Sequence, residues 1–243
     1  MKNIRVLSYN IHKGFGSRNR EFNLPRVREA LRQLNPDLIL LQEVQGTHNK
    51  NLKKVPGWPA TSQHEFLAMS IWPHFTYGKN AVYIDGDHGN AILSRFPILE
   101  SQNLNISQNR FEKRGMLHAL IKIEGRQSHF HAICTHLDLL AFSRKKQIEM
   151  ISQKIQNLIP RDESLILGGD FNDWHKAIQL PLDEAFLKRY GSFARTFPAR
   201  MPLLPLDRLY FRGFEVQSAK VLKGEPWSFL SDHAPILVEL KIN

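Results

Sequence analysis

Residues 116–137, MLHALIKIEGRQSHFHAICTHL, contain two apolar runs, Met116–Ile123 and His129–Leu137, separated by a short polar segment. The runs are joined at Gly125-Arg126, over a distance too short for a helical crossover, so the pattern predicts a β-hairpin. A sheet built only from parallel strands does not fit such a hairpin. This segment therefore favours an α+β fold.

Strand-like runs recur on both sides of the hairpin, and strands outnumber helices. The other expected strands are Ile4–Ile11, Leu38–Val44, Ala91–Ile98, Ser164–Gly169, Leu206–Phe211 and Pro235–Ile242. Helices are expected at Pro25–Leu34 and Ser143–Ile159, where Ile148, Ile151 and Ile155 form a core-facing stripe at period 3.6. We expect two sheets packed face to face with helices outside; a single sheet covered on one face is the alternative.

The chain is long enough to bury a full core. Its 243 residues are 42% hydrophobic and 23% charged, which excludes disordered and fibrous proteins. The sequence contains no repeat, low-complexity tract or linker, and Pro198–Pro205 is too short to separate domains. We expect one domain over residues 1–243, acting as a monomer.

Positive charge is in excess and unevenly spread. Lysine and arginine number 33 against 23 acidic residues, a net charge of +10. Residues 1–60 hold 11 basic and 4 acidic side chains, whereas residues 131–190 hold 8 of each. Such an excess indicates an anionic partner.

The single cysteine, Cys134, excludes an intramolecular disulfide framework and a cysteine-rich zinc site, and a buried thiol is expected. No apolar run reaches 18 residues, so no transmembrane segment is expected. Met1-Lys2 leads directly into a strand-like run without the apolar stretch of a signal peptide. We expect a cytoplasmic protein, although a chain whose leader had been removed would look the same.

Polar residues follow several of the apolar strands, where side chains leave the core and can meet at one rim. They are Asn10, Glu43, His136, Asp170 and Asn172, and the pair Asp232-His233 precedes the final strand. Each alone fits an ordinary turn or cap residue, but so many together indicate a site. Carboxylates and amides without thiolates suit a hard cation such as Mg²⁺ or Mn²⁺. With histidines and basic side chains, that set predicts hydrolysis of a phosphodiester.

The ordered motifs resemble the endonuclease/exonuclease/phosphatase superfamily, which includes DNase I and exonuclease III. The matching segments are Ser8–Ile11, Leu41–Val44, Gly89–Arg95, Thr135–Leu137, Gly169–Asp173, Leu206–Leu209 and Ser231–Pro235. This resemblance implies a DNase I-like, four-layer α/β/β/α sandwich with one active site at the rim where the sheets meet. A largely uncharacterised bacterial branch of the superfamily is the nearest likeness, so the resemblance names no substrate.

For the metal, the resemblance implies that Glu43 is the principal ligand of Mg²⁺ or Mn²⁺. Asn10 would help to coordinate the ion or hold its bound water, and Asp232 would lie near it as a second ligand. Asp170 would orient and deprotonate the attacking water, assisted by Asn172.

For the phosphate, the resemblance implies that His233 acts as charged stabiliser or general acid, with Asp207 fixing its orientation. His136 would donate to a phosphate oxygen. A surface ion pair between Asp207 and Arg208 is the alternative reading of Asp207.

Four further residues are candidates for substrate binding. Asn90 and Arg114 stand at the beginnings of strands, with a turn residue and a solvated loop cation as the alternatives. Arg144 begins a helix, where a cation opposes the helix dipole unless it meets an anion such as phosphate. Trp174 follows the Asp170–Asn172 motif and could stack on a base, and the same ring could instead lie in the core.

DNA is the expected substrate, because the +10 charge favours a polyanion and Lys13, Arg18 and Arg20 are close in sequence to Asn10. The alternative is a phosphodiesterase or phosphatase that acts on a phospholipid, a phosphoinositide or sphingomyelin, in which apolar residues beside basic ones enter a lipid surface. A binding module without catalysis is the remote alternative. We expect Phe197 and Phe229 to pack in the core, and Trp227 is left open.

Overall fold

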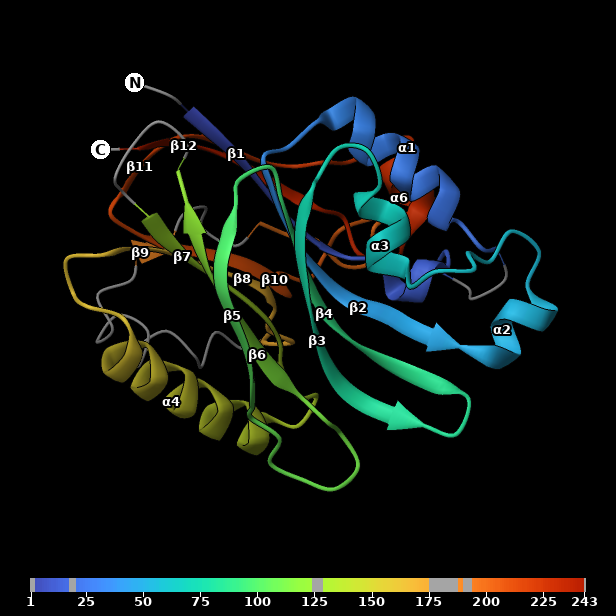
Figure 1. The fold of residues 1–243 in the computed structure, drawn as a ribbon, viewed down its shortest axis with the longest axis horizontal. Coiled ribbons are helices and arrows are strands. Elements are labelled where there is room, and N and C mark those ends of the chain that lie inside the picture. The colour runs from blue at the N-terminus through green and yellow to red at the C-terminus, as the bar shows by residue number, and fades with distance from the viewer. Residues whose placement is uncertain (1–2, 18–20, 124–128, 175–187, 190–193, 243) are drawn as a thin grey trace.

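The computed structural model describes residues 3–17, 21–123, 129–174, 188–189 and 194–242. Within these residues, two six-stranded sheets pack face to face (Figure 1). The first sheet has the order β11-β12-β1-β2-β4-β3, and the second has the order β5-β6-β7-β8-β10-β9.

The strands of the first sheet are β1 (Asn3–Asn10), β2 (Leu38–His48), β3 (His74–Tyr83), β4 (Gly86–Ser94), β11 (Phe214–Val221) and β12 (Ile236–Ile242). Those of the second are β5 (Ile98–Asn105), β6 (Gly115–Lys122), β7 (His129–His136), β8 (Ser164–Asp170), β9 (Lys188–Arg189) and β10 (Asp207–Arg212). The helices are α1 (Leu24–Leu34), α2 (Asn49–Lys54), α3 (Gln63–Ala68), α4 (Ala141–Leu158) and α6 (Trp227–Leu230), with a 3-10 turn at His12–Gly14.

The predicted hairpin is present. Strands β6 and β7 pair antiparallel, with Met116 opposite Thr135 and Lys122 opposite His129. Its turn at Gly125-Arg126 lies outside the described residues. Both sheets are mixed, because β1 pairs parallel with β2 and β7 pairs parallel with β8. The antiparallel hairpin therefore excludes a purely parallel sheet, as the sequence indicated.

Helices cover the outer face of each sheet, which makes the predicted four layers. Helices α1, α3 and α6 pack on the first sheet, and α4 packs on the second (Figure 1). Ile148, Ile151 and Ile155 of α4 are buried against the second sheet, as their periodicity predicted. Phe130 and Leu38 belong to the central core between the sheets. The single-sheet alternative is wrong.

The C-terminal boundary of the predicted strand Ala91–Ile98 is wrong. Strand β4 stops at Ser94 and β5 begins at Ile98, because the chain turns there. The hydroxyl of Ser94 bonds both the amide and the carbonyl of Phe96, which closes the turn. Strands β3, β5 and β11 were not expected from the sequence; β5 is mostly polar and exposed, and β3 and β11 are only partly buried.

Strand direction brings the polar residues to one rim. Parallel pairing puts His136, at the end of β7, beside Asp170, at the end of β8. Asp207 begins β10 directly opposite Asp170. In the first sheet, β12 starts opposite the end of β1, so that the residues before it, including His233, approach Asn10.

Candidate active site

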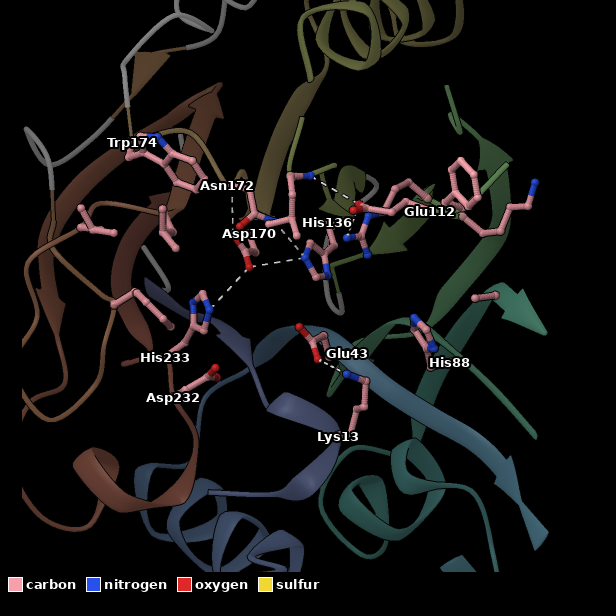
Figure 2. A pocket seen from close by; sticks show the side chains of 18 of the residues that line it. Lys13, Glu43, His88, Glu112, His136, Asp170, Asn172, Trp174, Asp232 and His233 are labelled. Carbon is pink, nitrogen blue, oxygen red and sulfur yellow. Dashed lines mark hydrogen bonds and ion pairs between the residues drawn. The ribbon is translucent and has the colours of Figure 1, made fainter. Parts of the chain in front are cut away.

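A cavity of about 440 Å³ lies at this rim and is lined by residues of both sheets (Figure 2). Its lining includes Glu43, Arg114, His136, Asp170, Asn172, Trp174, Asp232 and His233. Eight of the twelve residues expected from the sequence therefore face one space.

His233 lies between two buried carboxylates. Its Nδ1 is 2.7 Å from Oδ2 of Asp207, and its Nε2 is 3.6 Å from Oδ2 of Asp170. Burial alone would lower the pKa of His233, but the charges of Asp207 and Asp170 outweigh it and raise the pKa to about 10. His233 can therefore present a positive charge to the cavity at neutral pH.

Asp170 is fixed from several sides. Its Oδ2 accepts from Asn10 Nδ2 at 3.0 Å, and its Oδ1 accepts from the amide of Asn172 at 3.0 Å. Burial raises the pKa of Asp170 to about 6, and the positive charge of His233 opposes that rise. The carboxylate is thus held in place and is more basic than an exposed aspartate.

The backbone before Asp170 requires a glycine. Gly169 has φ of +152°, and a Cβ there would lie 1.8 Å from the carbonyl oxygen of Thr135 on β7. Only a residue without a side chain lets β8 approach β7 so closely at this point. The glycine therefore sets the register that places Asp170 beside His136.

Glu43 projects from an irregularity in β2. The pairing of β2 with β4 shifts register between Leu41 and Val44, and Glu43 itself has φ of +54°. Asn10 Nδ2 donates to Glu43 Oε1 at 3.2 Å, and Lys13 Nζ lies 2.9 Å from Oε2 (Figure 2). Burial would raise the pKa of Glu43, but the charge and hydrogen bond of Lys13 hold it well below its usual range. Glu43 is an ionised carboxylate facing the cavity.

These groups fit a hard divalent ion. Glu43 and Asp232 offer carboxylate oxygens to the same cavity, and Asn10 donates a hydrogen bond to Glu43. The lining contains no cysteine, and oxygen donors are the ligands that Mg²⁺ and Mn²⁺ prefer. The Lys13 ammonium already balances Glu43, so an ion at this carboxylate would compete with Lys13.

His136 and Asn172 form the wall on the side of the second sheet. Asn172 Nδ2 donates to the carbonyl of Leu137 at 3.0 Å and lies 3.1 Å from His136 Nε2. Burial, together with the charge of Arg114, keeps the pKa of His136 well below its usual value. His136 is therefore neutral at pH 7 and can donate one hydrogen bond to a ligand oxygen.

Two of the candidates for substrate binding line the cavity. Arg114 forms an ion pair of 2.9 Å with Glu112, and the ring of Trp174 is partly exposed at the mouth. The solvated-loop reading of Arg114 is wrong, since its side chain is largely buried.

The other two candidates lie outside the lining. Asn90 is buried and donates to the carbonyls of Gly115 and Cys134, so it joins the two sheets, and a direct substrate contact is not supported. Arg144 is also buried; it donates to the carbonyl of Asp138, and its guanidinium lies 5.1 Å from the ring of Trp174. Arg144 was expected either to contact phosphate or to be a solvated cation. Its buried position outside the cavity lining matches neither expectation.

The predicted surface ion pair between Asp207 and Arg208 is wrong, because Arg208 instead forms a buried ion pair of 2.8 Å with Asp173.

Phe197 was expected in the core but lines the cavity, with its ring centroid 5.1 Å from that of His233. Phe229 is partly exposed, so its core prediction is also wrong, whereas Trp227 packs in the core against Tyr9.

The sequence analysis missed His88 and Glu112 as lining residues. His88 directly precedes the Gly89–Arg95 motif, which is the signal that could have identified it. Lys13 was expected to flank the site and does so, while Arg18 and Arg20 lie outside the described residues.

Sequence comparison identifies the class of protein to which this fold and site belong. Residues 7–233 match the Endonuclease/Exonuclease/phosphatase family, and the chain belongs to that family. It is 42% identical over 244 residues to the uncharacterized protein YbhP of Escherichia coli K12, covering 98% of this chain and 96% of YbhP.

Solved structures share the fold. An endonuclease/exonuclease/phosphatase from Beutenbergia cavernae has a TM-score of 0.78 at 19% identity, over 100% of this chain and 72% of that one. The human Nocturnin catalytic domain has a TM-score of 0.75 at 18% identity, over 99% and 94% of the two chains. A mannosyl-6-phosphatase from Bacteroides thetaiotaomicron has a TM-score of 0.72 at 18% identity, over 98% and 100%. Members of this family are divalent-metal-dependent hydrolases of phosphoester bonds.

Proposed function

We propose that this chain is a phosphodiesterase that uses Mg²⁺ or Mn²⁺ and a water molecule aligned by Asp170. The observation that carries the proposal is the continuous contact from Asp207 through His233 to Asp170 and on to Asn10 and Glu43. These contacts place three groups around one cavity: the cationic imidazole of His233, the basic carboxylate of Asp170 and the ionised carboxylate of Glu43, which would bind the metal. The bound ion would supply positive charge that neutralises the phosphate oxygens.

In this mechanism the phosphate lies between Glu43 on one wall and His136, Asn172 and His233 on the other. Asp170 accepts a proton from water as the water oxygen attacks phosphorus in line with the leaving oxygen. The bond from phosphorus to the leaving oxygen breaks, and the leaving oxygen takes up a proton, from the His233 imidazolium where it acts as general acid or from water where His233 stabilises charge only. Asp207 holds the ring of His233 in place. No covalent intermediate with the protein is needed.

DNA is the first candidate substrate. The net charge of +10 favours a polyanion, and Lys13, Lys113 and Arg114 line the cavity. Lys13 and Arg114 are paired with Glu43 and Glu112, so a phosphate would compete for cations that are already balanced. A nuclease of this kind would bind DNA with an affinity that falls steeply as salt increases.

A phospholipid is the second candidate, and a specific observation favours it. Apolar side chains that line the cavity also protrude into solvent at its mouth, among them Phe111, which is 81% exposed, and Leu139, which is 53% exposed. Leu140 and Phe142 extend this exposed surface along the chain. Exposed apolar residues beside cations are typical of proteins that bind a lipid surface. No helix in the described part of the chain is long and apolar enough to cross a membrane.

One hydrolysis panel separates these candidates. Single- and double-stranded DNA, abasic DNA, RNA, a phosphoinositide and sphingomyelin are incubated with Mg²⁺ or Mn²⁺, with His233→Ala as the inactive control. Turnover of DNA supports the nuclease, and turnover of lipids alone contradicts it. If the wild type hydrolyses neither these diesters nor the monoester phosphates of the phosphoinositide, the binding-module alternative replaces the enzyme.

A companion measurement tests the lipid candidate. Phe111→Ser should weaken binding to vesicles of anionic phospholipid, whereas Leu99→Ser, at an exposed apolar residue on β5, should not. Equal vesicle binding by both variants contradicts the lipid candidate. A single domain, a monomeric state and a cytoplasmic location remain predictions, which gel filtration and cell fractionation test.

A further inference from the structure

A second cluster of ligand-type side chains lies away from the active site, on the α4 side of the second sheet. It consists of His118 on β6, His129 and His131 on β7, and Glu163, which directly precedes β8. Alternation along β7 explains the placement, since Phe130 faces the central core and its two neighbours face the opposite side. His129 and the active-site residue His136 occupy opposite ends of this eight-residue strand. Seven residue steps of extended strand separate them by about 23 Å.

Three donor atoms of this cluster converge. His129 Nε2 lies 3.3 Å from Glu163 Oε2, and His131 Nε2 contacts the same oxygen. Atoms of all three residues lie within 4.8 Å of one another. Tetrahedral zinc with bonds of about 2.0–2.1 Å separates its ligands by about 3.3 Å. The spacing of His129 and Glu163 therefore already matches one edge of a zinc site.

His118 stands behind the cluster, where it can orient His131. Its Nε2 lies 2.8 Å from His131 Nδ1, and the two rings stack at 5.1 Å. If His131 donates its Nδ1 proton to His118, its Nε2 keeps a lone pair for a metal. Metal-bound histidines usually donate their second ring proton to such a partner.

The site is open on one side. A cavity of about 680 Å³ is lined by these four residues together with Glu100, Leu120 and residues near the end of α4. His131 is buried, whereas His129 and Glu163 are partly exposed, so an ion can enter from solvent. Three protein ligands leave a fourth position for water, as in zinc sites of the two-histidine, one-glutamate type. The nearby guanidinium of Arg212 is turned to the carbonyls of Glu163 and Pro160.

We propose that His129, His131 and Glu163 form a zinc-binding site that is separate from the active site, with His118 as the residue that positions His131. Nitrogen donors distinguish it from the oxygen-rich active site, because imidazole suits Zn²⁺ and carboxylates with water suit Mg²⁺. A bound ion would tie the beginning of β7 to the segment before β8. The proposal does not depend on the reaction at the other end of β7.

Zinc titration of chelator-treated full-length protein tests this site, with millimolar Mg²⁺ present to occupy the active site. Wild type should bind one more equivalent of Zn²⁺ than His129→Gln, with a higher melting temperature when loaded. His129 is partly exposed, so this variant should fold. His118→Gln should keep the site but bind Zn²⁺ about 10- to 100-fold more weakly. The matched control is His74→Gln, which removes a histidine elsewhere and should bind as wild type does.

Cobalt gives a spectroscopic check, because Co²⁺ in a tetrahedral site shows intense visible absorption that should disappear in His129→Gln. Glu43→Gln, at the active site, should retain both the zinc equivalent and the cobalt spectrum. Unchanged zinc stoichiometry in His129→Gln would overturn the proposal. Loss of the zinc equivalent in Glu43→Gln would also overturn it, since the ion would then lie in the active site.

Discussion

Asp207 Oδ2 lies 2.7 Å from Nδ1 of His233, and both side chains are buried although 26 residues separate them in the chain. A buried charge is stable only when it is paired, so each residue stabilises the ionised form of the other. The pairing leaves His233 Nε2 directed toward Asp170 and the cavity. This contact fixes the orientation of His233 and stabilises its positive charge in the site.

Asp207→Asn should therefore lower kcat with little change in KM. The amide keeps the shape but loses the charge, so the pKa of His233 falls and its ring is no longer held in one orientation. A positioned acid or base contributes about 10²- to 10⁴-fold to the rate, and we expect a loss in that range. Steady-state kinetics on the active substrate of the panel measures it.

The control for this variant is Asp87→Asn, which alters another buried carboxylate, hydrogen-bonded to Tyr77 and Thr47. It should lower the melting temperature while kcat stays near the wild-type value. If Asp207→Asn retains full kcat, His233 does not depend on this contact.

Glu43→Gln tests the metal site. Removing the negative charge leaves Asp232 as the remaining carboxylate on that wall, so we expect Mn²⁺ affinity to fall at least about 10-fold, with loss of metal-dependent turnover. Titration calorimetry with Mn²⁺ measures the affinity. Chelator treatment of wild type should abolish turnover, and added Mg²⁺ or Mn²⁺ should restore it. Equal Mn²⁺ affinity in wild type and Glu43→Gln would exclude Glu43 as the principal ligand.

Gly169→Ala tests the close approach of β8 to β7. The new Cβ would meet the Thr135 carbonyl at 1.8 Å, so the strands must separate, and we expect destabilisation of about 3 kcal/mol. Gly57→Ala is the matched control, since Gly57 also has positive φ but no atom within 4 Å of an added Cβ. Its cost should be about 1 kcal/mol, from backbone strain alone. Urea denaturation measures both, and equal costs would contradict the account.

His64 predicts a pH dependence of stability away from the site. Burial lowers its pKa from 6.5 to about 4, and its ring stacks on Tyr77 at 4.6 Å. Because the unfolded chain takes up the proton first, the free energy of unfolding falls as pH drops from about 6.5 toward 4. Replacement by phenylalanine keeps a stacking ring without the proton, so His64→Phe should lose about 2 kcal/mol less between pH 7 and pH 4.5.

Denaturation of wild type and His64→Phe at both pH values measures this difference. Other histidines titrate equally in the two proteins, and their contribution cancels. Parallel pH curves would contradict a neutral, buried His64.

Local sequence was sufficient for the inner strands of both sheets and for most of the rim. Buried strands such as β7 and β8 are continuous apolar runs, and polar residues at their ends mark the points where they leave the core. The motif around Asp170 combines two glycines with an aspartate and an asparagine, and Gly169 allows the close approach of β8 to β7. These signals depend on neighbouring residues, so they can be read without the fold.

The remaining features depend on contacts between distant segments. Edge strand β5 carries mostly exposed polar side chains, and in β11 a bulge between Val216 and Ser218 interrupts the alternation of apolar residues that pack on the core. Asn90 lies inside β4, and its amide bonds carbonyl groups of the second sheet, a contact that its neighbours in the sequence do not reveal. Partners such as Arg208 with Asp173 likewise appear only once β10 pairs with β8.

The most direct test of the proposed reaction is single-turnover hydrolysis of the preferred phosphodiester in ¹⁸O-labelled water with Mg²⁺, comparing wild type with Asp170→Asn. We predict one ¹⁸O atom in the phosphate group of the wild-type product, because water attacks phosphorus. Asp170→Asn should be slower by at least about 10²-fold at an unchanged fold. Label found only in the alcohol product, or equal rates for the two proteins, would contradict water attack on phosphorus directed by Asp170.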